Sequence, residues 1–202
     1  MNNYKTKRKI IILNAPPGAG KDTIGRLIKE AMPEVTLKSM KESMFNIALA
    51  ILGQRAYRAF IEAYNDREQK EKPQLFLNGK TCREFMIWIS EDIVKPQFGD
   101  QHFGNQFVES ALNAGSTIVC TDGGFASEVK PLIKAGFYVD VFRLHRAGFT
   151  FQGDSRDWLN LGNYHHRYRE FDVALYDGEP ELSVASIINL SGLWYWDRIA
   201  NK

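Results

Sequence analysis

Short apolar runs alternate along this chain with stretches in which apolar residues recur every three or four positions. The first run, residues 9–13, ends just before a Pro-Pro-Gly sequence, as a buried parallel strand does where it enters a turn. Residues 21–32 then carry Ile24, Leu27 and Ile28 at helical spacing. The pattern therefore predicts a strand, a turn and a helix at the start of the chain.

The same alternation continues to the end of the chain. Further strands are predicted at residues 35–37, 116–121, 137–144 and 173–176. Further helices are predicted at residues 41–52, 54–64, 81–94, 101–113, 128–135 and 181–190, with a charged break at residues 66–73. Strands separated by helices favour a parallel sheet with right-handed crossovers and helices on both faces. We therefore expect a three-layer α/β/α fold with a five-stranded parallel sheet.

Length and composition limit the classes of protein that this chain can belong to. With 202 residues, 44% of them hydrophobic, we expect a single domain over residues 1–202 with a substantial core. Lys and Arg number 26 and Asp and Glu 24, which argues against a general nucleic-acid binder. The apolar run after the basic N-terminal residues is too short for a signal peptide or a membrane helix. Cys82 and Cys120 lie far apart without a CxxC motif, so a reducing cytoplasm is the expected compartment.

The turn after the first predicted strand, residues 14–23, reads Asn-Ala-Pro-Pro-Gly-Ala-Gly-Lys-Asp-Thr and is typical of a phosphate-binding loop. Glycines let the backbone curl so that several N–H groups face one anion, the helix N-terminus adds partial positive charge, and Lys21 reaches the outer phosphates. A plain Gly/Pro turn is the alternative, but the flanking strand and helix supply the context that the motif requires. The candidate nucleotide-binding residues are Pro17, Gly18, Ala19, Gly20, Lys21, Asp22 and Thr23.

The loop departs twice from the strict GxxxxGK[ST] pattern, because Ala15 replaces the first glycine and Asp22 follows the lysine. Residues 16–21 resemble the GPPGxGK form of adenylate-kinase-type enzymes. Residues 20–23, Gly-Lys-Asp-Thr, resemble the loop of bacteriophage deoxynucleoside monophosphate kinases. The hydroxyl of Thr23 is then the candidate on the metal side, with water as the alternative ligand there.

Asp122 follows the third predicted strand and precedes Gly123 and Gly124. An acid at the carboxyl end of a strand beside a phosphate loop can hold Mg²⁺ or contact the acceptor. A capped turn before the helix at residues 128–135 is a serious alternative, and one carboxylate can fill both roles.

Residues 145–170 lack clear periodicity, and we expect them to form a lid. Arginines cluster in and beside this segment, where Asp154 and Asp157 are the only acids that we expect to oppose them. Arginine forks bind the charge that spreads over a migrating phosphoryl group, and long irregular stretches in compact domains are usually functional or disordered. A solvated surface loop is the alternative. The predicted catalytic arginines are Arg143, Arg146 and Arg156.

The order of these features resembles that of the bacteriophage deoxynucleoside monophosphate kinases. The matching features are the Gly-Lys-Asp-Thr loop, Arg83-Glu84-Phe85-Met86, the Asp122 turn, Arg143 with the lid, and residues 171–178. The resemblance spans most of the chain and is patchy between Leu52 and Lys80. It implies an adenylate-kinase-like P-loop NTPase core with a helical acceptor-binding region at about residues 38–114.

The resemblance also implies roles for single residues. Residues 18–23 would hold the phosphates of ATP, Arg83 the acceptor phosphate, and Lys41 is a weaker candidate on the acceptor side. The family has an arginine shortly after the aspartate that corresponds to Asp122, and Gly-Gly-Phe at residues 123–125 lacks it. The identity of the acceptor is therefore open.

The expected reaction is in-line transfer from ATP, with Mg²⁺, to a (deoxy)nucleoside monophosphate, giving ADP and a (deoxy)nucleoside diphosphate. The acceptor is already an anion, so positioning and charge neutralisation are expected to suffice without a strong general base. A P-loop kinase of another small metabolite, a nucleotide-dependent switch or NTPase, and a module that only binds ATP are the alternatives. The preferred base, the sugar and a homodimer stay open, and the cytoplasm would be the host's if the chain is phage-encoded.

Overall fold

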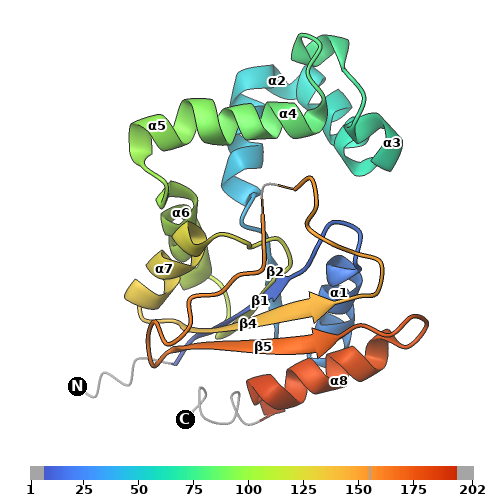
Figure 1. Ribbon diagram of the computed structural model, residues 1–202. Helices are drawn as coiled ribbons and strands as arrows, with labels where there is room; N and C mark the ends of the chain where they lie inside the picture. Colours follow the sequence, from blue (N-terminus) through green and yellow to red (C-terminus); the bar gives the residue numbers. More distant parts are fainter. Residues whose placement is uncertain (1–6, 155, 195–202) are drawn as a thin grey trace. The chain divides into compact units, whose positions relative to one another are not determined.

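Five parallel strands form one sheet in the order β2-β3-β1-β4-β5. The computed structural model describes residues 7–154 and 156–194 (Figure 1). The strands are β1 (Lys9–Asn14), β2 (Thr36–Lys38), β3 (Thr117–Cys120), β4 (Tyr138–His145) and β5 (Tyr168–Ala174). All six residues of the central strand β1 are buried, which explains the continuous apolar run at residues 10–13 within it. The predicted five-stranded parallel sheet is confirmed.

Helices cover both faces of this sheet, as Figure 1 shows. Helices α1 (Lys21–Ala31) and α8 (Pro180–Ser191) share one core cluster with Ile11 and Leu13 of β1. Helices α6 (His102–Leu112) and α7 (Ala126–Lys134) share the other with Ile10 and Ile12. Alternate residues of β1 thus enter opposite cores, as the two-residue period of a strand requires. The predicted three-layer α/β/α fold is confirmed.

Two compact units make up the chain: residues 1–40 with 104–202, called here the sheet unit, and residues 41–103, called the helical unit. Within the helical unit, α2 (Glu42–Asn65) is interrupted at Gly53, whose φ of 68° and ψ of 166° are not helical. The two helices predicted on either side of residue 53 therefore correspond to the two halves of α2. A side chain at this φ would be strained, which suits glycine.

The rest of the helical unit differs in detail from the pattern-based prediction. The predicted charged break at residues 66–73 contains the short helix α3 (Arg67–Lys70), followed by a 3₁₀ turn (Leu75–Leu77). The predicted helix at residues 81–94 is composed of α4 (Cys82–Ile87) and a π-helical segment (Trp88–Val94), and α5 (Lys95–Phe98) continues it. Thr81 and Glu84 form a capping box that starts α4 at the expected place.

The last strand begins earlier than its sequence suggested. β5 starts at Tyr168, five residues before the predicted strand, so residues 168–170 of the expected lid belong to the sheet. Arg169, Glu170 and Asp172 interrupt its apolar pattern, and a strand at the edge of the sheet tolerates such residues because one side is open to solvent. The irregular segment between β4 and β5 therefore covers residues 146–167, and is called the lid segment below.

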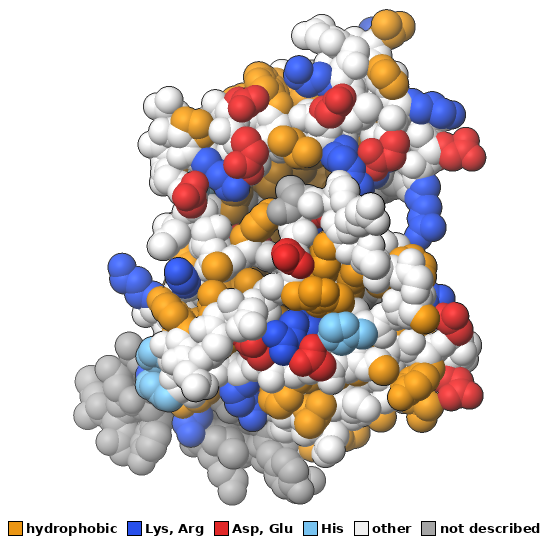
Figure 2. Space-filling view, viewed as in Figure 1, with side chains coloured by type: hydrophobic (Ala, Val, Ile, Leu, Met, Phe, Trp, Pro, Cys, Tyr) orange, Lys and Arg blue, Asp and Glu red, His pale blue; other side chains and the backbone are white. Residues whose placement is uncertain are grey.

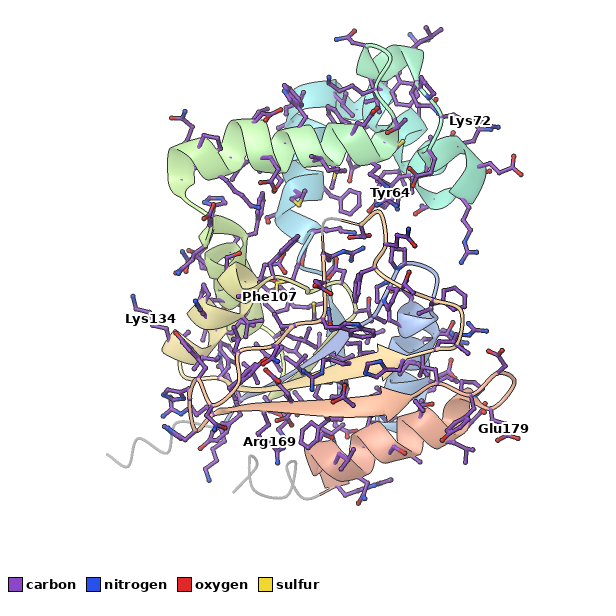
Figure 3. All side chains as sticks on the ribbon, in the orientation of Figure 1. Tyr64, Lys72, Phe107, Lys134, Arg169 and Glu179 are labelled. Atoms are coloured by element: carbon purple, nitrogen blue, oxygen red, sulfur yellow. The ribbon has the colours of Figure 1, made fainter. Side chains whose placement is uncertain are left out.

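A buried ion pair connects the C-terminus of α8 to the amino end of the sheet. Nζ of Lys9 donates to Oδ2 of Asp140 at 2.8 Å and also to the carbonyl oxygen of Ser191, the last residue of α8. Arg169, labelled on β5 in Figure 3, donates twice to the same carboxylate, at 2.8 and 2.7 Å. Burial lowers the pKa of Lys9, and Asp140 opposes that shift. The Lys9 ammonium group thereby offsets the partial negative charge of the carbonyl groups at the C-terminus of α8.

Candidate phosphate-binding site

The loop between β1 and α1 has the backbone geometry that an anion site needs. Gly18 and Gly20 have φ values of 77° and 106°, in the left-handed region that other residues enter only at a cost of about 1–2 kcal/mol. Gly20 is the N-cap of α1 and offers no side-chain cap, so backbone N–H groups of the first turn are left without a side-chain acceptor at this end. The partial positive charge of the helix is therefore available to a phosphate.

Two cationic side chains lie against this loop. Nζ of Lys21 reaches back to the carbonyl oxygen of Pro16 at 3.4 Å. Nη1 of Arg146 lies 3.4 Å from the carbonyl oxygen of Ala19. Asp177, just beyond β5, holds Arg146 there through Nε at 2.8 Å. The lysine and the arginine thus both flank the curled backbone, where the charge of a nucleotide's phosphates would concentrate.

Asp22 and Thr23 are exposed on the first turn of α1. An acid in this turn complements the positive end of the helix. The Thr23 hydroxyl lies at the start of the helix, so it is accessible to an ion that approaches with the phosphates. No group of three or more His, Cys, Asp or Glu side chains in the described part of the chain forms a metal site. Mg²⁺ commonly takes its ligands from substrate phosphates and water in such sites, and the exposed hydroxyl fits that mode of binding.

Asp122 accepts hydrogen bonds from the segment that follows β2. Its Oδ2 accepts from the Ser39 hydroxyl at 2.5 Å, and its Oδ1 accepts from the Met40 amide at 2.8 Å. The Cys120 thiol also donates to Oδ1, at 3.3 Å, and burial raises the pKa of that thiol well above its ordinary value. Asp122 therefore ties the segment after β2 to the end of β3, and its role towards Mg²⁺ or an acceptor stays a prediction.

The turn after Asp122 brings the lid segment to the end of β3. Glu128 accepts from the amides of Gly124 and Phe125 at 2.9 and 3.0 Å, which closes the turn. A Cβ atom on Gly124 would lie 2.9 Å from Cδ of Arg156, so only glycine lets the arginine pack here. Arg156 is itself held by Asp154, with two guanidinium contacts of 2.9 Å that raise its pKa.

Arg143 lies in β4 and is surrounded by acids of the edge strand. It donates twice to its cross-strand partner Asp172, at 2.9 and 2.7 Å, and once to Glu170 at 3.1 Å. Hydrogen bonding to Asp172 raises the pKa of Arg143 and, reciprocally, lowers that of Asp172. These printed contacts use three of the five N–H donors of the Arg143 guanidinium group.

The expectation of a cationic lid opposed only by Asp154 and Asp157 was wrong. Acids from neighbouring strands and from beyond β5 neutralise the cluster, and a count along the sequence does not reveal such cross-strand pairs. These acids are Asp140, Glu170, Asp172 and Asp177. Figure 2 shows the same mixture of signs, with Lys and Arg side chains interspersed among Asp and Glu over the face in view.

The lid segment also carries aromatic side chains that no sequence motif singled out. Trp158 lies 4.2 Å from His145 between ring centroids and meets Phe151 edge-on at 5.0 Å. Trp158 and Phe151, together with Phe149 and Arg156, line an open hollow of about 570 Å³ on the lid segment. Such rings combine with polar groups in sites that bind small molecules.

The two acceptor-side candidates lie in the helical unit. Nζ of Lys41 donates to the hydroxyl of Tyr64, labelled on α2 in Figure 3, at 3.3 Å. Arg83 donates through Nε to both carboxylate oxygens of Glu71, at 3.0 and 3.2 Å. Lys70 lies over the Tyr64 ring, 3.8 Å from its centroid. Lys41 and Lys70 thus both contact Tyr64, and the contact of Lys41 and Arg83 with an acceptor stays a prediction.

Comparisons with solved structures give matches of low identity. The chain is similar to a putative kinase from Chloroflexus aurantiacus j-10-fl (14% identity, 96% of this chain and 98% of that chain, TM-score 0.49). It is similar to a gluconokinase from Sinorhizobium meliloti 1021 (14%, 95% and 98%, TM-score 0.46) and to a shikimate kinase from Bacteroides thetaiotaomicron (12%, 91% and 98%, TM-score 0.40). These scores lie below 0.5 and assign neither an activity nor a substrate to this chain.

No protein-family model matches the chain, and no curated protein matches it. The resemblance to bacteriophage deoxynucleoside monophosphate kinases therefore stays a prediction. In the described residues, none of the helices has the length and apolar character required to cross a membrane.

Proposed function

We propose that this protein transfers the γ-phosphoryl group of ATP to a small anionic acceptor, a (deoxy)nucleoside monophosphate. One observation carries the proposal: a curled glycine loop joins a wholly buried parallel strand to a helix whose N-terminus has no side-chain cap. That combination supplies several N–H donors and a positive helix end to one anion, and Lys21 lies over it.

The side chains around the loop have the chemistry that phosphoryl transfer needs. In the proposal, Lys21 and Arg146 neutralise the charge that spreads over the phosphate oxygens, while Arg143 and Arg156 join them when the lid segment closes. Mg²⁺, held by the phosphates with Thr23 or Asp122, would supply further charge neutralisation. Because the acceptor is already ionised, the protein has to position the reactants and exclude water, without removing a proton with a strong base.

The acceptor assignment has less support than the donor assignment. Lys41 and Arg83 offer cations for an acceptor phosphate. An anionic acceptor would compete with Glu71 for the Arg83 guanidinium group. A kinase of another small phosphorylated metabolite shares the same donor chemistry.

The test is an assay of the full chain with ATP and Mg²⁺ against each nucleoside and deoxynucleoside monophosphate, and against a panel of small metabolites. ADP is quantified, and the phosphorylated product is identified by mass. The proposal predicts a nucleoside diphosphate as product, with ADP release that depends on the acceptor. A different phosphorylated metabolite would overturn the acceptor class, whereas ATP binding without any product would overturn phosphoryl transfer itself.

A further inference from the structure

Asn14, the last residue of β1, makes contacts that nothing in its sequence motif requires. The residue is 1% exposed. Oδ1 accepts from the Leu159 amide at 3.0 Å, and Nδ2 donates to the Asp157 carbonyl at 3.3 Å. One amide side chain therefore uses both its acceptor and its donor on the backbone of the lid segment, as a neighbouring strand would.

The part of the lid segment that follows is fastened at a second point. Glu170 of β5 accepts from the amides of Leu161 and Gly162, at 2.5 and 3.2 Å, and from the Tyr168 hydroxyl at 2.7 Å. Its other oxygen accepts from Arg143 at 3.1 Å. Residues 157–162 are thus joined to β1 through Asn14 and to β5 through Glu170, and we call them the return segment.

Arg156 comes immediately before the return segment and packs across Gly124. The backbone position of Arg156 depends on that of the next residue, Asp157, whose carbonyl oxygen accepts a hydrogen bond from Asn14. The side-chain amide that fixes this point belongs to the residue at which the phosphate loop begins. The same residue thus connects the loop and the arginine through two hydrogen bonds, of which the one to Leu159 is buried.

From this connection we propose that Asn14 is a positioning residue, which holds the return segment so that Arg156 lies in register with the phosphate loop during transfer. The kinetic part of this inference rests on the proposed function. The structural part, that Asn14 holds the return segment, rests on the hydrogen bonds alone. Asn14 does not touch the reacting atoms in this scheme and acts through Arg156. Loss of its side chain should therefore lower kcat about 100-fold, the cost of a misplaced catalytic group, while ATP affinity changes little.

The kinetic test is a double-mutant cycle with Asn14→Ala, Arg156→Ala and the double variant in the complete chain. Asn14→Ala should lower kcat in the parent protein and have little further effect in the Arg156→Ala background, because in the proposal Asn14 acts only through Arg156. An equal fold loss in both backgrounds would overturn the proposal. Asn113→Ala serves as the control, since Asn113 is an exposed residue whose side chain contacts the Glu109 carbonyl at the end of α6.

A conservative variant separates positioning from simple packing. Asn14→Asp keeps the shape and the acceptor but, when ionised, loses the donor to Asp157. Burial raises the pKa of such a carboxyl group, and protonation restores a donor. The kcat of Asn14→Asp relative to the parent should therefore rise as the pH falls, and a ratio that is independent of pH would overturn the proposal.

The structural readout does not depend on any activity. Hydrogen exchange at the Leu159 amide should accelerate at least tenfold in Asn14→Ala and stay unchanged in Asn113→Ala, with equal unfolding midpoints as the folding control. Unchanged exchange at Leu159 would overturn the proposal even in an active kinase. A parent protein without any transfer would instead contradict the proposed function, and the exchange result would still decide whether Asn14 holds the return segment.

Discussion

The two ends of the sheet both carry a lysine, and they use it in opposite ways. At the amino end, Lys9 is 2% exposed and bonded to Asp140 and to the last carbonyl of α8. At the carboxyl end, Lys21 is partly exposed and lies on a loop whose glycines adopt left-handed φ values. A buried charge makes the fold depend on its partner, because loss of that partner leaves the charge uncompensated, whereas a charge beside an accessible backbone loop is placed where a ligand can reach it.

The arginines repeat this contrast. Arg169 shares the buried carboxylate of Asp140, which belongs to the core. Arg146 pairs with Asp177, an acid whose side chain is 76% exposed, and it lies on the phosphate loop. An exposed ion pair contributes little stability and exchanges readily for a better partner. We therefore expect mutations at the amino end to change mainly stability, and those at the carboxyl end to change mainly turnover.

The largest expected effect comes from Lys21→Ala. Loss of this cation should lower turnover at least about 100- to 1,000-fold, because one preorganised charge on the transferred group is removed. The free energy of unfolding should change by less than about 1 kcal/mol, since the residue is not part of the core. Turnover and urea unfolding are measured on the same preparation.

Lys134→Ala is the matched control for that change. Lys134 is exposed at the end of α7, as Figure 3 shows, and its removal should leave both turnover and stability unchanged. Wild-type turnover in Lys21→Ala would show that the Lys21 cation of the phosphate loop does not contribute to transfer.

The reverse pattern is expected for Asp140→Ala at the amino end. The change leaves the Lys9 ammonium buried without its carboxylate, which costs about 3–5 kcal/mol of stability. The turnover of the fraction that stays folded should be close to that of the parent. Chemical denaturation gives the stability, and turnover is corrected for the folded fraction.

Glu30→Ala is the corresponding control, because Glu30 pairs with Arg26 on the exposed face of α1 and such pairs contribute about 0–1 kcal/mol. A loss of turnover without a loss of stability in Asp140→Ala would contradict the expectation that the amino end of the sheet affects mainly stability.

Gly20→Ala tests the backbone of the loop without changing its charge. At φ 106° an alanine costs about 1–2 kcal/mol, and relief of that strain would turn the first N–H groups of α1 away from the phosphates. We expect weaker ATP binding, by about tenfold, together with a small loss of stability. Calorimetric titration with ATP measures the first effect and thermal unfolding the second. Unchanged ATP affinity would show that the loop tolerates a side chain at residue 20.

The smallest effect concerns the pH dependence of Arg143 and Asp172. The hydrogen bonds from Arg143 lower the pKa of Asp172 in the folded protein. The stability from this pair is therefore fully present above the unfolded pKa of about 3.9 and is lost as the pH falls through the lower folded value.

Because the Asp172 side chain is 56% exposed, its contribution should stay below about 1 kcal/mol. Asp172→Asn should flatten the stability curve slightly below about pH 4, as followed by unfolding at successive pH values. An identical slope in parent and variant would exclude Asp172 as a source of acid sensitivity.

The features that sequence alone predicted have local causes. The run at residues 9–13 is buried on both faces, so its composition reports its place in the sheet. The helix break at Gly53 and the start of α4 at Thr81 follow from backbone freedom and capping, which also act within a few residues. The glycine loop belongs to the same class.

The features that were missed depend on contacts between distant residues. The partners of Arg143 are 27 and 29 residues away in the sequence, and those that join Asn14 to the lid segment are 143 and 145 residues away. Asp122 was expected either at the metal or as a cap, and its bonds to Ser39 and Met40 come from the segment after a different strand. No periodicity encodes such pairs, because only the folded sheet brings their strands together.

The charged residues of β5 affect how two copies of this protein can associate. An edge strand offers unpaired backbone groups to any other strand, and charged side chains along it are a common protection against such pairing. Arg169, Glu170 and Asp172 make β5 difficult to recognise as a strand, and they also make it a poor template for sheet extension. These charges therefore disfavour association of two copies through this edge, and replacing the three residues with valines would favour aggregation.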